Sequence, residues 1–305
     1  MLSWSQELER SAFALAAGRL GQLRAQRVAR VDSTNTALLQ AAQRGDICPQ
    51  VLWADVQTAG RGRLGRQWHS TGAIADDGAG APERRSLTFS LGLALAPQAW
   101  SGLSLVVGLA VAEVLGADIA LKWPNDVCVR GTSGYAKLGG ILLETQALSE
   151  TVAPSLAAQT GLHHDAPARW LVIGVGLNVQ GHPSADLRAP ATDICSALPT
   201  EQAQTLLADL PALCTRLILA ILQAVLRFET TGFAPFAPAF SQRDVLLGQS
   251  VATFQEGQQV ETGAALGVAA DGSYQLRLAD GRLHAIHSAE ISLRPSTLGT
   301  ESLTL

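Results

Sequence analysis

The spacing of hydrophobic residues predicts alternating strands and helices over the first 240 residues. Apolar runs bounded by polar or glycine-rich segments are typical of buried strands, and they occur at 50–58, 86–95, 119–123, 126–130, 138–145 and 170–179. The strands at 126–130 and 138–145 read as a pair, and glycines break the run at 170–179. Helices are predicted at Ser5–Arg27, Thr36–Arg44, Leu103–Leu115 and Glu201–Gly232. A short strand ends at Val31, and the cap-type residues 32–35 follow it.

The pattern changes after Phe240. Short alternating strands follow, separated by glycines and by Asp-Gly pairs at 271–272 and 280–281, which is typical of hairpins. They predict a β-barrel of about fifty residues, an ordinary size for a compact β module. We therefore predict an α+β chain with two domains, 1–243 and 244–305.

Composition adds information about the core, the charge and the cysteines. The chain has 305 residues, 47% of them hydrophobic, so it can bury a large core. Its formal net charge of −4 gives no overall field that favours nucleic acid or an acidic membrane, so affinity for phosphate must be local. The four cysteines are scattered without metal-type spacing, which predicts buried thiols in a reducing compartment.

No targeting segment is expected. Glu7, Glu9 and Arg10 stand where the apolar run of a signal peptide should begin, and Glu113 and Asp118 interrupt the longest apolar stretch. These features predict a cytoplasmic protein. The predicted helix ending at Arg27 is too short for a winged-helix domain, so we expect no DNA-binding domain.

The most unusual segment is "GRGRLGRQWHS" at 60–70, called here the Arg/Gly loop. It places Arg61, Arg63 and Arg66 among Gly60, Gly62 and Gly65, ahead of Trp68. Glycines allow close backbone approach to a ligand, and guanidinium groups suit phosphate or carboxylate. The loop predicts a phosphate site with Trp68 as a lid or hinge; the alternative is a solvated turn.

Three further segments carry candidate chemistry. In "KWPNDVCV" at 122–129, Lys122, Asn125 and Asp126 could hold a nucleotide and its magnesium, or form a simple Pro-Asn-Asp turn. In "KLGGILLE" at 137–144, Lys137 suits electrostatic catalysis, although a surface lysine is the plainer interpretation. In "GVGLNV" at 174–179, Asn178 could contact a ribose or phosphate, or be a turn residue; the full dinucleotide glycine motif is absent.

In this order the segments resemble the biotin protein ligase family, the biotin–[acetyl-CoA carboxylase] ligases, from about Val28 to Arg294. The resemblance is carried by "DSTN" at 32–35, "QTAGRGRLGRQW" at 57–68, "KWPND" at 122–126, "KLGGILLE" at 137–144, "GVGLNV" at 174–179 and "EISLR" at 290–294. It implies a mixed sheet backed by helices, of the class II synthetase and biotin–lipoate ligase type, and an SH3-like C-terminal barrel.

The family resemblance also implies a two-step reaction. Biotin and Mg-ATP give biotinyl-5′-AMP and pyrophosphate, and a lysine of a biotin carboxyl carrier domain then takes the biotinyl group and releases AMP. The implied ligands are ATP, biotin and Mg²⁺, with no metal ligand assigned, and the implied protein substrate is the carrier subunit of acetyl-CoA carboxylase. Both monomers and homodimers fit the resemblance.

Site residues follow from the same resemblance. Ser33, Thr34, Asn35 and Gln57 match biotin contacts, and Arg61, Gly62 and Arg63 match contacts to carboxylate and phosphate. Lys137 matches the main catalytic residue, supported by Arg63, and neutralises charge in the transition state. Asn125, Asp126 and Asn178 match positions near the nucleotide or magnesium, and Gly60 and Gly140 leave room for the ligand. Trp68 is expected under the adenine, and Arg294 at the nucleotide or the carrier.

Two segments depart from the family pattern, and other functions fit the same segments less well. Residues 71–85 are longer than expected and lack the usual run into the next strand, and residues 147–169 resemble an insertion. The alternatives are a lipoate or octanoate ligase on the same fold, and a non-catalytic biotin-responsive regulator. The combination of "GRGRLGRQW" with "KWPND" argues against the first, and the expected lack of a DNA-binding domain argues against the second.

Overall fold

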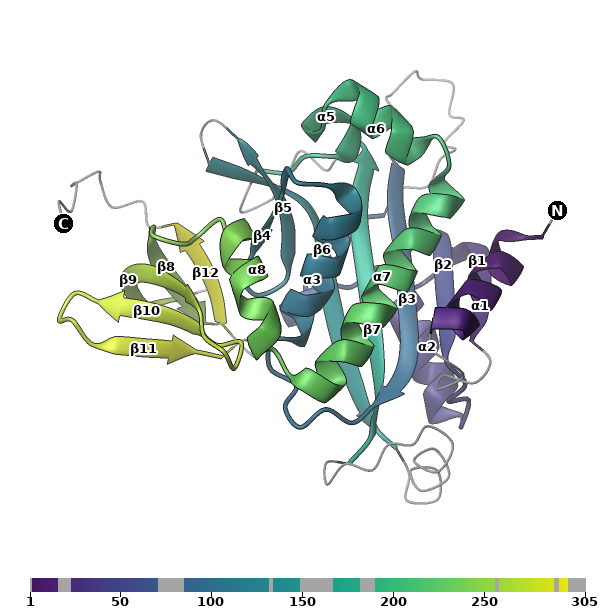
Figure 1. Ribbon diagram of the computed structural model, residues 1–305, viewed down its shortest axis with the longest axis horizontal. Coiled ribbons are helices and arrows are strands. Elements are labelled where there is room, and N and C mark those ends of the chain that lie inside the picture. The colour runs from purple at the N-terminus through teal and green to yellow at the C-terminus, as the bar shows by residue number, and fades with distance from the viewer. Residues whose placement is uncertain are drawn as a thin grey trace.

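A seven-stranded sheet forms the centre of the molecule (Figure 1). The computed structural model describes residues 2–15, 23–70, 85–131, 134–148, 167–181, 190–255, 258–287 and 291–295. The spatial order of the strands is β1-β2-β3-β7-β6-β5-β4. Their bounds are β1 Arg24–Val31, β2 Gln50–Gln57, β3 Arg85–Leu95, β4 Ile119–Lys122, β5 Asp126–Gly131, β6 Gly134–Ala147 and β7 Arg169–Gln180. β1 and β2 run parallel and the other neighbours antiparallel, which confirms the predicted mixed sheet.

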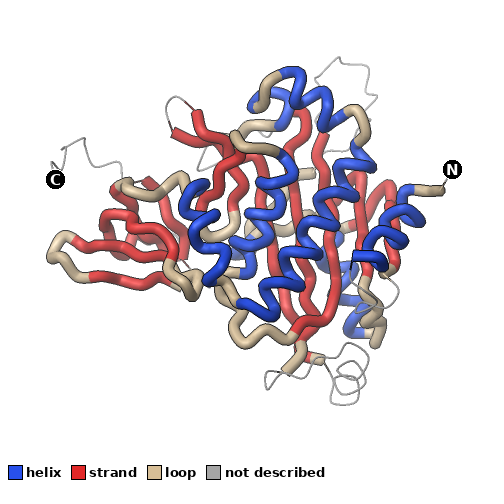
Figure 2. The backbone as a smooth tube through the Cα atoms, viewed as in Figure 1, coloured by secondary structure: helices blue, strands red, loops and turns tan. Residues whose placement is uncertain are grey.

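Helices cover the two faces of this sheet unequally. One face carries α1 Trp4–Leu15, α3 Leu103–Leu115 and α7 Leu210–Thr231, which Figure 2 shows as a layer in front of the strands. Alternate residues of β7 separate the faces: Ile173 packs in the core with α3 and α7, whereas Trp170 and Val172 pack against α2 Thr34–Gln43 on the other side. The α2 face beyond this helix is left open for the site.

The long helix α7 is a core element. By length and composition alone it could cross a membrane. In the fold, however, it packs against α3, α1 and β3 and buries nine of its residues. Core helices of soluble proteins meet the same criterion of length and hydropathy, and this packing is what such a helix requires.

A second, five-stranded antiparallel sheet follows the short helices α5 Ile194–Ala197, α6 Thr200–Leu207 and α8 Ala237–Arg243. Its strands lie in the order β11-β10-β9-β8-β12. Their bounds are β8 Ser250–Gln255, β9 Gln258–Val268, β10 Tyr274–Leu278, β11 Leu283–Ile286 and β12 Ile291–Pro295. Gly272 and Gly281 have positive φ, as the Asp-Gly hairpin turns require. The predicted hairpins are confirmed, and the domain boundary at 243/244 stays a prediction.

The second sheet is attached to the first through buried side chains. Tyr274 packs against Trp123, with ring centroids 5.6 Å apart, and its hydroxyl donates to Asp244 Oδ2 at 2.7 Å. Burial raises the pKa of Asp244. Because Trp123 belongs to the "KWPND" segment, the C-terminal sheet helps to fix that segment in place.

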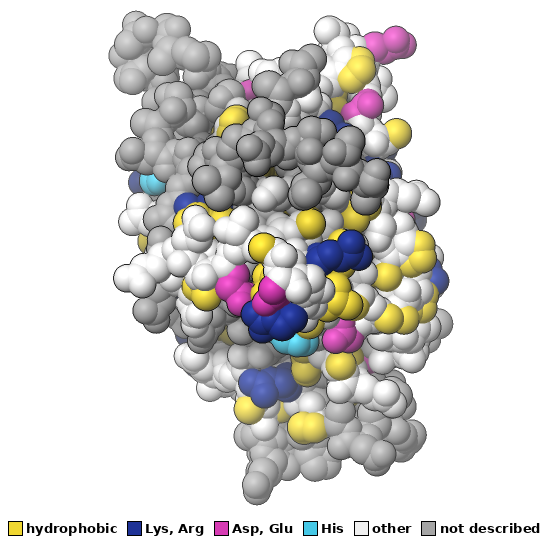
Figure 3. Space-filling model, turned by 90° about the vertical axis from the view of Figure 1, so that its left-hand side faces the viewer, with side chains coloured by type: hydrophobic (Ala, Val, Ile, Leu, Met, Phe, Trp, Pro, Cys, Tyr) yellow, Lys and Arg dark blue, Asp and Glu magenta, His cyan; other side chains and the backbone are white. Residues whose placement is uncertain are grey.

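The outward side of the C-terminal sheet mixes both signs of charge. Figure 3 shows basic, acidic and histidine side chains next to one another among polar and apolar groups. Arg282 pairs with Asp280 at 2.6 Å, and His284 pairs with Glu261. Basic groups on this sheet are thus partly neutralised by their acidic neighbours.

Three sequence predictions need correction. The predicted helix Ser5–Arg27 is wrong at its C-terminal end, because residues 24–27 belong to β1. β1 is an exposed edge strand rich in arginine, so it lacks the apolar run that marks the inner strands. The helix α2 begins at Thr34 rather than Thr36, since Ser33 is its N-cap. The strand β7 is continuous through its glycines. Residues 71–84 and 149–166 lie outside the described residues.

Candidate active site

A cavity of about 520 Å³ lies on the face of the sheet that α2 leaves open. It brings together segments that are far apart in the sequence. The predicted site residues that line it are Ser33, Thr34, Asn35, Gln57, Arg61, Gly62, Arg63, Trp68, Asn125, Asp126, Lys137, Gly140, Asn178 and Arg294. Among the predicted residues, only Gly60 is not part of the lining as the structure describes it.

The floor of the cavity is made by glycines of β7. A Cβ atom at Gly174 would lie 2.3 Å from Asn35 Oδ1, and one at Gly176 would lie 2.5 Å from the Trp68 ring. Both distances are far inside van der Waals contact. The glycines therefore let Asn35 and Trp68 lie flat against the strand, which explains the "GVGLNV" segment without a nucleotide-type glycine turn.

One end of the cavity is polar and uncharged. Ser33 caps α2 by accepting from the Thr36 amide at 3.4 Å. Gln57 Oε1 accepts from the Thr34 amide at 2.8 Å and from its hydroxyl at 3.1 Å. Ser90 Oγ lies 2.6 Å from both Thr34 Oγ1 and Asn35 Oδ1. This network fixes the first turn of α2 against β2 and β3.

Sequence reasoning missed Ser90 and Thr88 of β3. Both side chains are buried, and Thr88 lines the cavity. The available signal was their spacing: Ser86, Thr88 and Ser90 are polar residues at alternate positions of a mostly apolar strand, so they share one face. In a fully buried strand, such a polar face indicates a site.

Replacing Gly174 with alanine tests this floor. The added methyl group would displace the Asn35 amide from its contact with Ser90, so we expect the free energy of unfolding to fall by about 1–3 kcal/mol. Urea unfolding measures the change. Gly140→Ala is the control, because its added Cβ would approach no atom closer than 3.5 Å. Equal stability of the two variants would contradict the tight packing of Asn35.

The Arg/Gly loop forms a small closed hairpin. The Trp68 amide donates to the Gly60 carbonyl at 2.8 Å, and the Gly62 amide donates to the Arg66 carbonyl at 2.7 Å. A Cβ at Gly60 would lie 2.4 Å from the Trp68 carbonyl oxygen. Gly60 thus permits closure of the loop, and this contact accounts for the residue better than the predicted contact with a ligand.

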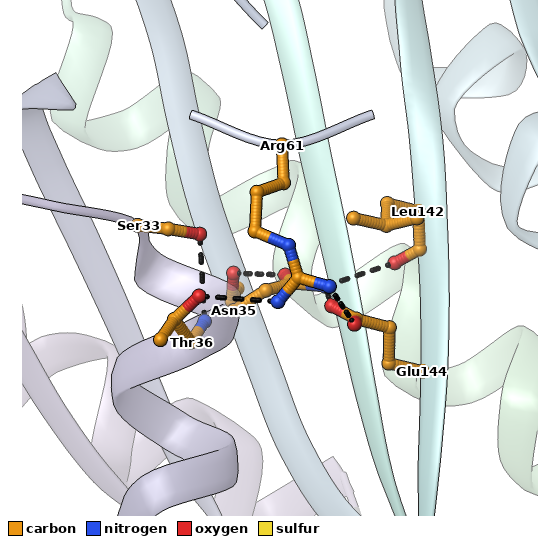
Figure 4. Close-up of polar contacts among 7 residues, drawn as sticks. Ser33, Asn35, Thr36, Arg61, Leu142 and Glu144 are labelled. Atoms are coloured by element: carbon orange, nitrogen blue, oxygen red, sulfur yellow. Dashed lines mark hydrogen bonds and ion pairs between the residues drawn. The ribbon is translucent and has the colours of Figure 1, made fainter. Parts of the chain in front are cut away.

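Several side chains hold the loop against the domain, and one of them is Ser70, whose hydroxyl bonds the Gln57 backbone. The Arg61 guanidinium donates to Thr36 Oγ1 at 3.2 Å and to Glu144 Oε1 at 2.6 Å, as Figure 4 shows. Arg63 donates to Asn125 Oδ1 at 3.3 Å, and burial lowers the pKa of its guanidinium. The Trp68 ring lies on Gly176. The loop is therefore anchored to α2, to the "KWPND" segment and to β7 at once.

The other end of the cavity is strongly cationic. Among the described residues its lining contains a single carboxylate, that of Asp126. The cationic side chains of the whole lining are Arg61, Arg63, Arg66, Lys122, Lys137 and Arg294, of which Arg61 contacts Thr36 beside the neutral end. Arg294 also stacks on Phe254, with its guanidinium carbon 4.0 Å from the ring centroid. A local excess of positive charge in an acidic protein matches the prediction of a local phosphate site.

Asp126 organises the two lysines of the site, which are the only lysines in the sequence. Lys137 Nζ lies 2.5 Å from Asp126 Oδ1, and Lys122 Nζ lies 3.4 Å from Oδ2. Burial acts to raise the pKa of Asp126, but the two ammonium groups outweigh it and lower the pKa to about 2. The carboxylate is therefore ionised at neutral pH and orients both lysines.

The backbone of Lys137 is fixed by a segment that the sequence did not reveal. The Lys137 amide donates to the Pro190 carbonyl at 2.7 Å, and the Thr192 amide donates to the Lys137 carbonyl at 2.9 Å. Asn178 Nδ2 donates to the Thr192 carbonyl at 3.0 Å. Asn178 thus supports the strand that carries Lys137 as well as lining the cavity.

The depressed pKa of Asp126 predicts a pH dependence of stability. The pKa falls from an ordinary 3.8 to about 2 on folding. This shift contributes about 2 kcal/mol that is present above about pH 4 and is lost as the pH falls through about 2. Between about pH 4 and about pH 2, the free energy of unfolding of Asp126→Asn, measured with urea, should fall less steeply than that of the unaltered protein. Equal slopes of unfolding free energy against pH would contradict the pairing of Asp126 with the two lysines. The control is Asp55→Asn, which alters an exposed ion pair.

The described residues contain no group of three or more His, Cys, Asp or Glu side chains that could hold a metal ion. The cavity offers Asp126 and the amide of Asn125 as oxygen donors. This fits a Mg²⁺ ion that is held mostly by nucleotide phosphates, with one protein carboxylate nearby. It does not fit a resident metal centre.

Comparison with known proteins agrees with this geometry. Residues 28–158 match the model of the biotin/lipoate A/B protein ligase family, and residues 246–294 match the biotin protein ligase C terminal domain. The mixed sheet, the cationic cavity and these two matches place the chain among the biotin and lipoate protein ligases.

Individual relatives show which kind of ligase this chain is similar to. The chain is 32% identical over 273 residues to the bifunctional ligase/repressor BirA of Escherichia coli, covering 87% of this chain and 72% of that protein. It is 30% identical over 274 residues to the biotin–[acetyl-CoA-carboxylase] ligase of Paracoccus denitrificans, covering 87% and 98%. The solved biotin protein ligase from Aquifex aeolicus in complex with biotin and ATP matches with a TM-score of 0.62 and 26% identity, covering 89% and 99%. The chain belongs to the biotin protein ligase family.

Proposed function

We propose that this chain is an ATP-dependent biotin protein ligase, which activates biotin as biotinyl-5′-AMP and transfers it to a lysine of a biotin carboxyl carrier domain. The observation that carries the proposal is the division of one cavity into two ends. Ser33, Thr34 and Gln57 form a neutral, hydrogen-bonding end, and Arg63, Lys122 and Lys137 form a cationic end around Asn125 and Asp126. Such a cavity suits a ligand with an uncharged polar ring at one end and an anion at the other.

Biotin and ATP have this distribution of charge. The ureido ring of biotin is neutral and hydrogen-bonding, and its valerate chain ends in a carboxylate that meets the phosphates of ATP. Thr34 and Gln57 would contact the ring. Arg61, Gly62 and Arg63 would face the carboxylate and the α-phosphate.

In the first step a carboxylate oxygen of biotin attacks the α-phosphorus of ATP. The bond from the α-phosphorus to the bridging oxygen breaks, and pyrophosphate leaves. Negative charge accumulates on the α-phosphate oxygens in the transition state, where fixed cations stabilise it most. Lys137, oriented by Asp126, and Arg63 would supply this charge, and Mg²⁺ bound to the phosphates would neutralise the leaving group.

In the second step the amine of the carrier lysine attacks the acyl carbon of the mixed anhydride. An amide forms, AMP leaves with the electrons of the broken C–O bond, and the attacking amine loses its proton. Until the carrier arrives, the anhydride needs protection from water. The Arg/Gly loop would give it, since its residues line the cavity and its Trp68 ring lies on Gly176.

The remaining assignments are also proposals. Trp68, whose ring lies on Gly176, would support the adenine, and Asn125, Asp126 and Asn178 would face the nucleotide or its magnesium. Arg294 would let the C-terminal sheet reach the nucleotide or the carrier. We propose the carrier subunit of acetyl-CoA carboxylase as the protein substrate and the cytoplasm as the compartment. The lack of DNA binding and a homodimer stay predictions.

Lipoate or octanoate ligation is the nearest alternative, since the first family model covers both biotin and lipoate ligases. The match of residues 246–294 to a biotin protein ligase domain and the names of the Paracoccus denitrificans and Aquifex aeolicus proteins favour biotin. A purely regulatory protein is disfavoured by the same relatives, which are all described as ligases.

A transfer assay tests the proposal. Purified protein is mixed with biotin, Mg-ATP and an isolated biotin carboxyl carrier domain, and the mass of the carrier is followed. We expect one biotinyl group per carrier, and none on a carrier whose target lysine is replaced by arginine. A carrier that gains mass from lipoate and not from biotin would overturn the assignment.

A further inference from the structure

The carboxylate of Glu144 joins two parts of the site. Glu144 lies on β6, seven residues after Lys137, and its side chain is 19% exposed. One oxygen, Oε1, accepts from the Arg61 guanidinium at 2.6 Å, and the other, Oε2, accepts from Asn35 Nδ2 at 2.9 Å. Figure 4 shows Glu144 beside Arg61 and Asn35, where the loop meets the start of α2. No step of the proposed reaction uses Glu144.

Glu144 is one of three groups that contact the Asn35 amide and favour one orientation of it. Asn35 Oδ1 lies against the Ser90 hydroxyl, and its Nδ2 donates to Glu144 and weakly to the Leu142 carbonyl at 3.4 Å. If the amide were turned over, its carbonyl oxygen would meet the carboxylate and the Leu142 oxygen, and all three are acceptors. Asn35 is almost fully buried, so such a mismatch is costly.

The same carboxylate holds the Arg/Gly loop. Arg61 forms a β-bridge with Gln67 across the base of the loop, so fixing Arg61 fixes the hairpin. Its guanidinium contacts Thr36, one residue along α2 from Asn35, as well as Glu144. A second side-chain anchor, from Arg63 to the neutral amide of Asn125, is longer at 3.3 Å. A charge-assisted hydrogen bond is the stronger of the two kinds.

We propose that Glu144 is a positioning residue that both holds the Arg/Gly loop in place and orients Asn35. The loop is then correctly placed at the cavity only when Asn35, at the neutral end, is correctly oriented. The part that concerns biotin rests on the function proposed above. The part that concerns the loop does not, and it can be tested without activity.

Limited trypsin digestion of the full chain tests the seating of the loop, because Arg63 and Arg66 are cleavage sites. Glu144→Gln keeps the size of the side chain and removes its charge. We expect cleavage after Arg63 and Arg66 to be about three- to tenfold faster, because the variant loses one partly buried ion pair that holds the loop. The matched control is Asp55→Asn, which neutralises the acceptor of an Arg27 ion pair at 2.8 Å outside the cavity. It should leave loop cleavage unchanged.

A double variant tests whether the two side chains act through each other. If they do, Arg61→Gln with Glu144→Gln should be cleaved after Arg66 no faster than the more sensitive single variant. The proposal would be overturned if the increases in cleavage rate of the two single variants multiplied in the double variant. It would also be overturned if the loop of Glu144→Gln were cleaved at the rate of the unaltered protein. Should Glu144→Gln not fold, Arg61→Gln removes the same ion pair from the loop side, and unchanged cleavage after Arg66 would overturn it equally.

Kinetics test the orientation of Asn35. In biotin-dependent pyrophosphate release, Glu144→Gln should raise the KM for biotin by about tenfold and change kcat by less than about threefold, since it removes binding common to ground and transition states. Equal changes in both constants would overturn the coupling to Asn35. Absence of pyrophosphate release from the unaltered protein would reject the proposed function instead, and the trypsin result would still decide the role of Glu144 in the loop.

Discussion

Replacing Lys137 with alanine should slow biotin-dependent pyrophosphate release at least about a hundredfold, a loss of about 3 kcal/mol of transition-state stabilisation. Lys137 is fixed from both sides: its ammonium group lies 2.5 Å from Asp126, and its backbone is bonded to residues 190–192. A cation held in this way need not reorganise when charge develops on the α-phosphate. Transfer from preformed biotinyl-5′-AMP to the carrier should slow as well.

The control for this variant is Lys122→Ala. Both lysines contact Asp126, but the Lys122 contact is longer, at 3.4 Å. If Lys137 acts on the substrate, Lys122→Ala should cost much less activity. Equal losses would show that neutralisation of Asp126, rather than contact with substrate, is what matters, and near-normal turnover of Lys137→Ala would contradict its catalytic role outright.

Replacing Arg63 with glycine should allow the adenylate to form and then escape. Arg63 closes the loop onto Asn125 and lines the cavity, so its removal loosens the cover over the mixed anhydride. We expect bound biotinyl-5′-AMP to dissociate about ten- to a hundredfold faster, as for a lid that has lost a principal contact. Release of labelled adenylate after a chase with unlabelled biotin and ATP measures the rate.

Glycine also makes the loop more flexible, so a second variant separates the two causes. Arg63→Ala removes the guanidinium without adding a glycine. Similar leakage from both variants would assign the effect to the lost contact. Retention of the adenylate by Arg63→Gly for as long as in the unaltered protein would contradict the role of the loop as a lid.

The sequence was informative where one local property was sufficient. Long apolar runs revealed the inner strands, Asp-Gly pairs revealed the hairpins of the C-terminal sheet, and the Arg/Gly loop revealed a cationic site. The strand ending at Val31 was predicted, but the start of β1 was assigned to a helix, because most of its residues are exposed and its arginines interrupt any apolar pattern.

Contacts between distant residues could not be predicted in this way. Glu144 and Arg61 are 83 positions apart, and either would be an ordinary surface charge if the fold did not bring them together. Ser90 looks like any polar residue in a strand until Thr34 and Asn35 are placed beside it. The pairing of Lys137 with Asp126 depends on the register of β5 against β6, and that of Lys122 on the register of β4 against β5, which composition does not specify.

The most direct test of the account is pyrophosphate release from ATP by the purified protein, measured with biotin, with lipoate and with neither. The cavity predicts release with biotin and essentially none in the other two reactions, because the neutral end offers hydrogen-bond partners that suit a ureido ring and have no counterpart in lipoate. Release with lipoate alone, or silence in all three reactions, would contradict the conclusion that this site activates biotin.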